Sequence, residues 1–252
     1  MTPTNPSPIP AEEILGKFTD ERDGYFKLEY MQYEQMRVAT EKLRREQDHR
    51  NGILQGMLDD SSHTAFGIST TDDRGNPRPA YYALRRTAQP VTVSIDKVGH
   101  QYFVYISNDS AEDQKLGGVL KIINKTSTSV IGCGYFSTTV GGGEVSTPVA
   151  LDISALGDGE TMVVEVYGHC GSDRCFYRNG SLLLRPSEVG YTVDREKCKI
   201  KFESLTYIHA VMIDGDLVAE DNCFSLLPGE VREIGYRPLK AECDISVIGY
   251  TV

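Results

Sequence analysis

The stretch Val91–Asp109 reads VTVSIDKVGHQYFVYISND, which is two runs of β-branched and aromatic residues separated by a turn. Such runs are typical of antiparallel strands, because these side chains pack well on a pleated surface. Similar runs recur at intervals of about ten residues, with turn residues between them. This spacing predicts an immunoglobulin-like β-sandwich over residues 90–176. The other supporting runs are GGVLKII (117–123), STSVIGCGYF (127–136), TPVALDI (147–153) and TMVVEVYG (161–168).

A second β-rich segment follows a break at residues 168–175, GHCGSDRC. Its runs keep the same succession of strand and turn residues. Residues 177–252 are enough for another small sandwich, so we expect a second immunoglobulin-like domain there. Its expected strands include CKIKFES (198–204), YIHAVMI (207–213), EVREIGY (230–236) and CDISVIGYTV (243–252).

The chain before Pro90 has a different composition. Prolines recur among Thr, Ser and Asn near the N-terminus, and we expect residues 1–24 to form a flexible tail. From Tyr25 to Gln47 the chain has no Gly or Pro and is rich in good helix formers, which predicts a long helix. Apolar residues fall near one face of that helix at three- and four-residue spacing, namely Leu28, Met31, Val38, Ala39 and Leu43.

Two further elements complete this N-terminal part. Residues 52–58 read as a short strand after an Asn-Gly turn, and residues 79–88 read as a second helix with proline in its first turn. A helix–strand–helix unit over residues 25–89 cannot close a core alone, because its single strand would leave two edges unpaired. We therefore expect the unit either to pack on the first sandwich or to be the end of a larger domain.

Charge and composition exclude several classes of protein. The chain has 36 acidic and 26 basic residues and a net charge of −10. Because phosphate neutralisation needs an excess of basic residues, we expect no nucleic acid and no anionic membrane as partners. No apolar run reaches the ~18 residues that a membrane-spanning helix needs. The N-terminus has neither the basic nor the apolar region of a secretory signal, which predicts a cytoplasmic location.

The cysteines and acidic turns give no sign of a cofactor. The six cysteines include no C-x-x-C pair and no histidine at zinc spacing, so we expect neither a metal site nor a cofactor. A disulfide between Cys170 and Cys175 is left open. Residues 72–76 resemble part of a calcium loop, but the regular alternation of ligands is missing and we interpret them as a turn.

Two motifs point to a known family. Residues 33–91 contain, in order, a Gln- and Arg-rich helix, GILQGMLDD (52–60), an Asp-x-x-Gly turn (72–75), PAYY (79–82), an Arg pair (85–86) and QPV (89–91). Near the C-terminus stands AEDNCFSLLPGEVREI (219–234). In this order they resemble glycoside hydrolase family 2, β-mannosidase type. The resemblance implies that residues 25–89 are the last α/β unit of a (β/α)8 barrel and that sandwich domains follow it.

The chain departs from the family around the expected eighth strand. Tryptophans that wall the family's sugar site are replaced by Gly56 and Ser62, and the chain has no Trp. The family's Asp is retained as Asp60, and Asp59 replaces its Asn. The resemblance implies that Asp60 and Asp59 bind substrate in a complete barrel, and the alternative is a loop carboxylate that caps a turn. Adjacent strand residues point to opposite faces, so the two cannot flank one glycosidic bond.

The family's catalytic carboxylates have no counterpart here. They lie in an Asn-Glu pair and a Ser-Glu-Phe segment, and the sequence has neither. We therefore expect no catalytic residue in this chain. The predicted function is that of the C-terminal accessory portion of a β-mannosidase-like glycoside hydrolase, a family that hydrolyses terminal β-mannosides with retention, and the chain alone is expected to be inactive. Its expected partner is a β-linked sugar in a complete enzyme. The alternatives are a free-standing carbohydrate-binding or interaction module, and a subunit that completes an N-terminal barrel-bearing chain in trans.

Overall fold

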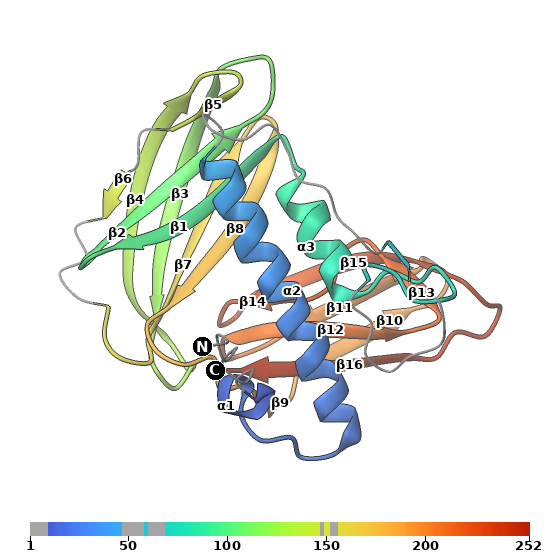
Figure 1. The fold of residues 1–252 in the computed structure, drawn as a ribbon. Helices are drawn as coiled ribbons and strands as arrows, with labels where there is room; N and C mark the ends of the chain where they lie inside the picture. The colour runs from blue at the N-terminus through green and yellow to red at the C-terminus, as the bar shows by residue number, and fades with distance from the viewer. Residues whose placement is uncertain (1–9, 47–57, 60–68, 147–148, 152–155) are drawn as a thin grey trace, which may run out of the picture.

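Two β-sandwiches and the helices that pack against them form the described part of the chain (Figure 1). This computed structural model describes residues 10–46, 58–59, 69–146, 149–151 and 156–252. All strand pairs in the described part of the chain are antiparallel. The predicted mainly-β class with two immunoglobulin-like sandwiches after a helical segment is therefore confirmed.

The first sandwich packs two sheets on a shared apolar core. One sheet has the order β4-β3-β7-β8, and in the other β2 lies between β1 and the short strands β5 and β6. Alternate residues of the paired strands β1 and β2, such as Val93 and Val104, are fully buried against Val164 of β7. The strands are β1 (Val91–Val98), β2 (Gln101–Asn108), β3 (Gln114–Ile123), β4 (Val130–Val140), β5 (Glu144–Val145), β6 (Val149–Leu151), β7 (Thr161–Gly168) and β8 (Gly171–Arg178).

The second sandwich is smaller and has two four-stranded sheets, ordered β10-β11-β15-β13 and β14-β12-β16-β9. Its core contains Ile200 and Phe202 of β11, and these face Val211 of β12. The strands are β9 (Arg185–Ser187), β10 (Gly190–Asp194), β11 (Lys199–Glu203), β12 (Ile208–Gly215), β13 (Leu217–Ala219), β14 (Phe224–Leu226), β15 (Val231–Pro238) and β16 (Ile245–Thr251).

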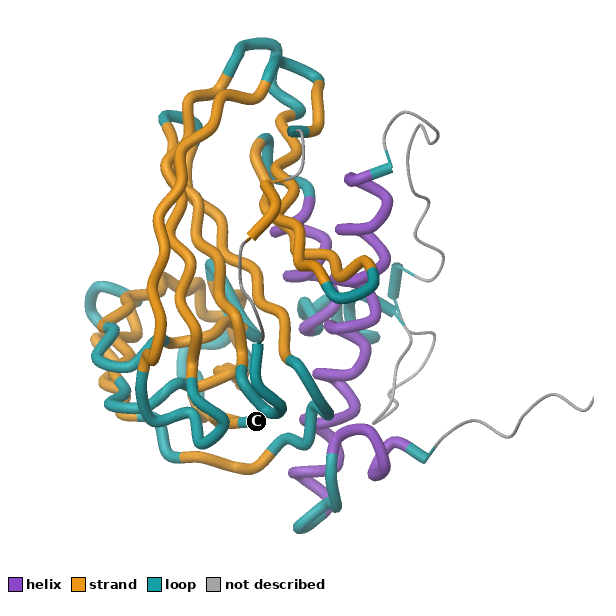
Figure 2. Tube along the Cα trace, turned by 90° about the vertical axis from the view of Figure 1, so that its left-hand side faces the viewer, coloured by secondary structure: helices purple, strands orange, loops and turns teal. Residues whose placement is uncertain are grey.

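The helices lie side by side along one side of the two sandwiches (Figure 2). They are α1 (Ala11–Leu15), α2 (Glu21–Arg45) and α3 (Pro79–Thr87). A third core joins Tyr30 of α2 to Val163 of the first sandwich and to Met212 and Tyr250 of the second. The helical unit thus packs on the first sandwich, as the first of the two expectations had it, and on the second sandwich as well.

Residues 10–24 are not the tail that the sequence predicted over residues 1–24. Asp20 accepts a hydrogen bond from the Asp23 N–H (2.8 Å) and so caps the start of α2. Asp23 in turn pairs with Lys27 (3.0 Å) and accepts from the Tyr250 hydroxyl (2.8 Å). These contacts fix the first turn of α2 against the last strand. The predicted strand over residues 52–58 lies outside the described residues apart from Leu58.

The buried face of α2 also differs from the predicted one. The side chains of Phe26, Tyr30 and Tyr33 are buried, whereas Val38 of the predicted apolar stripe is 49% exposed and Ala39 is also exposed. Further along the helix the buried side is charged. Tertiary ion pairs decide which face is buried, and an apolar pattern alone does not reveal them.

Candidate functional site at the junction of the helices and sandwiches

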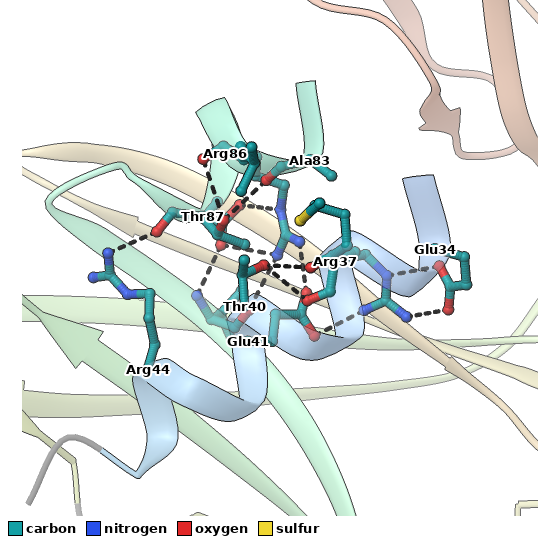
Figure 3. Close-up of polar contacts among 12 residues, drawn as sticks. Glu34, Arg37, Thr40, Glu41, Arg44, Ala83, Arg86 and Thr87 are labelled. Atoms are coloured by element: carbon teal, nitrogen blue, oxygen red, sulfur yellow. Dashed lines mark hydrogen bonds and ion pairs between the residues drawn. The ribbon is translucent and has the colours of Figure 1, made fainter. Parts of the chain in front are cut away.

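A buried chain of ion pairs runs from α2 through α3 to the first sandwich (Figure 3). The Arg37 guanidinium donates to Glu34 through Nε (2.8 Å) and to Glu41 through Nη1 (2.8 Å). The other oxygen of Glu41 accepts from Arg86 Nη1 (2.6 Å). Arg86 also donates to both oxygens of Asp173, at 2.8 and 3.0 Å. Both guanidinium groups therefore have more than one acceptor, which compensates for their burial.

The local sequence explains this arrangement in part. Glu34, Arg37 and Glu41 stand three and four residues apart, so α2 brings them onto one face. Asp173 lies on β8, and its Oδ2 also accepts from the N–H of Val93 at 2.8 Å. This second bond ties the edge of one sheet to the other and holds the carboxylate in line with Arg86.

A second cluster joins the two sandwiches directly. Arg174 of β8 donates to Glu165 of β7 (2.6 and 3.0 Å), to both oxygens of Glu230 (2.9 and 3.0 Å) and to the carbonyl of Ser225 (3.0 Å). Lys121 is a further partner of Glu165 at 2.6 Å. One guanidinium thus bridges carboxylates from both sandwiches, and all three of its nitrogens are used.

His209 lies at the centre of the junction, 2% exposed. Its Nε2 is 2.6 Å from the hydroxyl of Tyr30, and its Nδ1 is 3.2 Å from the hydroxyl of Tyr207. The edge of its ring meets Phe176 of the first sandwich, with the centroids 4.4 Å apart. Burial, together with the nearby positive charges of Arg37 and Arg178, lowers the pKa of His209 to about 3. The imidazole is therefore neutral and can donate from one nitrogen and accept at the other.

A cavity of about 420 Å³ opens between these groups. It is bounded by α2, α3, β7, β8, β12, β14, β15 and the segments that precede and follow β14. Its walls combine aromatic rings with paired charges. The residues that line it are Tyr30, Tyr33, Arg37, Tyr82, Arg86, Glu165, Tyr167, Ser172, Asp173, Arg174, Phe176, His209, Asp221, Cys223, Phe224, Ser225, Glu230 and Arg232.

The carboxylates of the cavity are not arranged for acid–base chemistry. Burial would raise the pKa of Glu165, but Arg174 and Lys121 outweigh it and the pKa of Glu165 is lowered. Burial does raise the pKa of Asp173, although Arg86 and the Val93 N–H oppose that shift. Asp221 pairs with Arg232 at 2.5 Å, and Glu230 with Arg174. Each carboxylate that lines the cavity is thus held by an arginine, whereas a glycosidase needs one free nucleophile and one proton donor.

Of the two predicted substrate-binding residues, only Asp59 lies within the described residues. Asp59 is exposed and makes an isolated bridge with Thr71, and it does not line the cavity. Asp60 lies outside the described residues. Asp72 accepts hydrogen bonds from the N–H groups of Arg74 (2.9 Å) and Asn76 (2.8 Å), which is the geometry of a turn.

Sequence reasoning missed the residues that do gather at the junction. Arg86 and Asp173 are 87 residues apart in the chain, so no local motif connects them. The one signal of the junction in the sequence is the three- and four-residue spacing of Glu34, Arg37 and Glu41 on α2. The C-terminal motif at Asp221–Glu230 contains strand β14 and the turns on either side of it, and in the first turn Asn222 accepts from the N–H and donates to the C=O of Ile213 (2.8 and 2.9 Å).

The described residues also bear on the questions of a metal site, a disulfide and a membrane-spanning helix. No group of three or more His, Cys, Asp or Glu side chains is placed there to hold a metal ion. All six cysteines are free, so the disulfide between Cys170 and Cys175 that the sequence left open is not formed. No helix in this part of the chain is long and apolar enough to cross a membrane.

The fold is shared with glycosidases. No protein-family model and no curated protein matches the sequence. Among solved structures, the exo-chitosanase CsxA of Amycolatopsis orientalis is similar with a TM-score of 0.70 and 16% identity, over 95% of this chain and 35% of that one. The β-D-mannosidase of Dictyoglomus thermophilum is similar with a TM-score of 0.76 and 16% identity, over 94% of this chain and 31% of that one. The chain therefore spans about a third of the length of these enzymes.

Proposed function

We propose that this chain is the C-terminal accessory portion of a β-mannosidase-like glycoside hydrolase and has no hydrolytic activity of its own. The observation that carries the proposal is the match of nearly the whole chain to about a third of two glycosidases. In this proposal residues 25–89 are the last α/β unit of the barrel, and residues 90–176 and 177–252 are the two sandwich domains that brace it.

The pairing of carboxylates with arginines at the junction supports a role without catalysis. Retaining glycosidases need two carboxyl groups about 5 Å apart, one ionised and one with a raised pKa that protonates the leaving group. At the junction Glu165 and Glu230 share the Arg174 guanidinium, and Asp173 is bound by Arg86. Arginine pairing lowers the pKa of Glu165, whereas burial raises the pKa of Asp173, and in all three residues the arginines occupy the carboxylate oxygens that would have to reach a substrate. These groups therefore support the packing of the domains.

The outward face of α2 supports a barrel as partner. Val38 is 49% exposed, Ala39 is exposed and Leu28 is only partly buried, whereas Met31 of the same predicted stripe packs against the core that joins α2 to the sandwiches. An apolar helix face of this kind is normally covered by another element. In the proposal the other units of the barrel cover it. A partner in trans is the second candidate, and the same exposed face favours it.

Hydrolysis assays with purified residues 1–252 test the proposal. The substrates are the 4-nitrophenyl β-D-glycosides of mannose and glucosamine, the sugars named for the similar enzymes, with the galactoside and glucuronide alongside. We expect no release of nitrophenol above buffer. Release that disappears in a Glu165→Gln or Glu230→Gln variant would contradict the proposal.

Isolation of the chain from its native source tests the alternatives. Co-purification with a barrel-bearing chain, lost when Val38→Arg places a charge on the outward face of α2, would favour completion in trans. Val231→Arg is the matched control, because Val231 is 57% exposed on β15. A monomer that binds mannan with no other chain present would favour a free-standing carbohydrate-binding module.

A further inference from the structure

Strand β4 of the first sandwich is an edge that the bracing role leaves open. In its sheet it pairs only with β3, and no hydrogen bond links the backbone of residues 131–139 to any described residue outside β3. With 11 residues β4 is also the longest strand in the described part of the chain. A row of open N–H and C=O groups of this length is a template for pairing with another strand.

The composition of β4 does not protect it from such pairing. Its sequence, VIGCGYFSTTV, contains no charged residue and no proline. Among the described residues, the edge strands β5, β6, β9, β10, β13 and β14 have five residues or fewer. The longer edge strands β1 and β8 carry charges, for example Asp96 and Arg174. Since natural proteins protect edge strands by shortness or by charge, the exception at β4 indicates that this edge has a partner.

The side chains of β4 leave room for that partner. Ile131, Cys133 and Tyr135 alternate along one side of the strand and are exposed, and Tyr135 is 81% exposed. On the other side, a Cβ at Gly134 would meet only Leu120, at 4.0 Å. Packing within the chain therefore does not require glycine here, and a glycine inside a strand is typical of a site where another backbone approaches closely.

A second copy of β4 matches this edge. Tyr135 is the midpoint of Val130–Val140, so two antiparallel copies related by a two-fold axis at Tyr135 overlap along all 11 residues. Two chains that each carry a net charge of −10 repel one another, and an uncharged strand is where they can approach at least cost.

The ends of β4 carry opposite charges, which favours the antiparallel arrangement. Exposed Lys125 lies in the turn that joins β3 to β4, at the Val130 end. At the other end lie exposed Glu144 and Asp113, and Asp113 accepts from the N–H of Gly142 at 3.3 Å. Antiparallel pairing places the basic end of one copy beside the acidic end of the other, and the two-fold axis repeats this contact.

We propose that β4 pairs with β4 of a second copy of this chain and joins two four-stranded sheets into one continuous sheet. In the described residues each chain has one such edge, so the association closes at two copies. The interface uses none of the ion pairs of the junction and needs no barrel. The proposal therefore goes beyond the bracing function, and the two can fail separately.

The size of the interface predicts a weak dimer. A strand edge about 37 Å long and about 10 Å thick covers roughly 370 Å² per copy, less than the ~800 Å² per partner of a standard interface. The paired strands would make about ten main-chain hydrogen bonds, which is the number in a typical interface. We therefore expect a dissociation constant in the range of about ten to several hundred micromolar.

Sedimentation velocity of the full chain under reducing conditions, from about 2 µM to about 1 mM, measures this association. The average mass should rise toward that of a dimer. Tyr135→Lys places two lysines opposite each other at the two-fold axis and should weaken the dimer about tenfold, and Ser137→Lys on the same side of β4 should also weaken it. Val231→Lys is the matched control, because Val231 is 57% exposed on β15, which is not an edge strand; we expect no change.

Disulfide formation tests the register. In the proposed pairing Ser137 of one copy lies opposite Cys133 of the other, close enough for a disulfide if Ser137 is replaced by cysteine. Under mild oxidation we expect a covalent dimer of Ser137→Cys, and none when Cys133→Ser is added. Equal amounts of covalent dimer in both variants would contradict the register.

Three outcomes of sedimentation would overturn the proposal. They are a monomer at all concentrations, species larger than a dimer, and a dimer that both Tyr135→Lys and Ser137→Lys leave unchanged. Thermal unfolding at the lowest concentration verifies that each variant is folded.

Discussion

Lowering the pH from 7.5 to 5 is expected to destabilise the chain through His209. This imidazole is buried between the hydroxyl groups of Tyr30 and Tyr207, where one ring nitrogen donates and the other accepts. Protonation would turn both nitrogens into donors and place a cation near Arg37 in a buried site. Burial accordingly lowers the pKa of His209 in the folded chain to about 3, whereas the unfolded value is about 6.5.

The sign and size of the effect follow from these two values. Between pH 6.5 and pH 3 the unfolded chain binds a proton that the folded chain does not bind, so acid favours unfolding. The free energy of unfolding should fall by about 1.4 kcal/mol for each pH unit in this window. From pH 6.5 to pH 5 the loss is therefore about 2 kcal/mol. Glu41 and Glu165, whose folded pKa values are lowered, lose their contribution only at lower pH, below their usual value of 4.5.

Urea unfolding at several pH values, followed by circular dichroism, measures this loss. His209→Gln is the control, because the amide can still donate and accept but does not titrate. The wild type should lose about 2 kcal/mol more stability than the variant between pH 6.5 and pH 5. Parallel pH profiles for the two proteins would refute the account of His209 as a buried, neutral imidazole.

Three substitutions test other contacts, with urea unfolding as the measurement. Arg174→Met should destabilise by about 2 kcal/mol, because it leaves carboxylates of both sandwiches without their shared cation, and an unchanged midpoint would show that the bridge is not formed. Asn222→Ala should cost about 2–3 kcal/mol, since it leaves the buried N–H and C=O of Ile213 unpaired; a loss below about 0.5 kcal/mol would speak against this turn. Asp20→Ala should cost about 1 kcal/mol through loss of the cap of α2, whereas Asp20→Asn should be nearly neutral.

The strands could be predicted from sequence because their pattern is local. The runs beginning at Val91, Gln101 and Thr161 were predicted as strands from their residue types and from the turn residues between them, and each forms a strand. The long helix was also predicted, but it begins at Glu21 rather than Tyr25. The earlier start depends on the side-chain cap from Asp20. Because residues 1–24 were predicted as a tail from their prolines, this capping residue was not assigned to the helix.

The junction could not be predicted, because its contacts are tertiary. Burial of Arg37 and Glu41 is favourable only with Arg86 and Asp173 in place, and these come from α3 and β8. The predicted apolar stripe of α2 includes Val38 and Ala39, which are exposed, so it did not indicate the face that the ion pairs bury. The predicted substrate residues Asp59 and Asp60 rested on a family resemblance. Asp59 does not line the cavity and Asp60 lies outside the described residues, so the role of these two carboxylates stays a prediction.

The most direct test of the central claim is whether this chain contains a glycosidase nucleophile. Retaining glycosidases form a covalent glycosyl-enzyme intermediate, and an activated 2-deoxy-2-fluoro-β-D-mannoside makes that intermediate long-lived. We would incubate residues 1–252 with this reagent and measure the intact mass, with the β-mannosidase of Dictyoglomus thermophilum as the positive control. We predict an unchanged mass for this chain. A gain of one fluoroglycosyl group on a single carboxylate would contradict it.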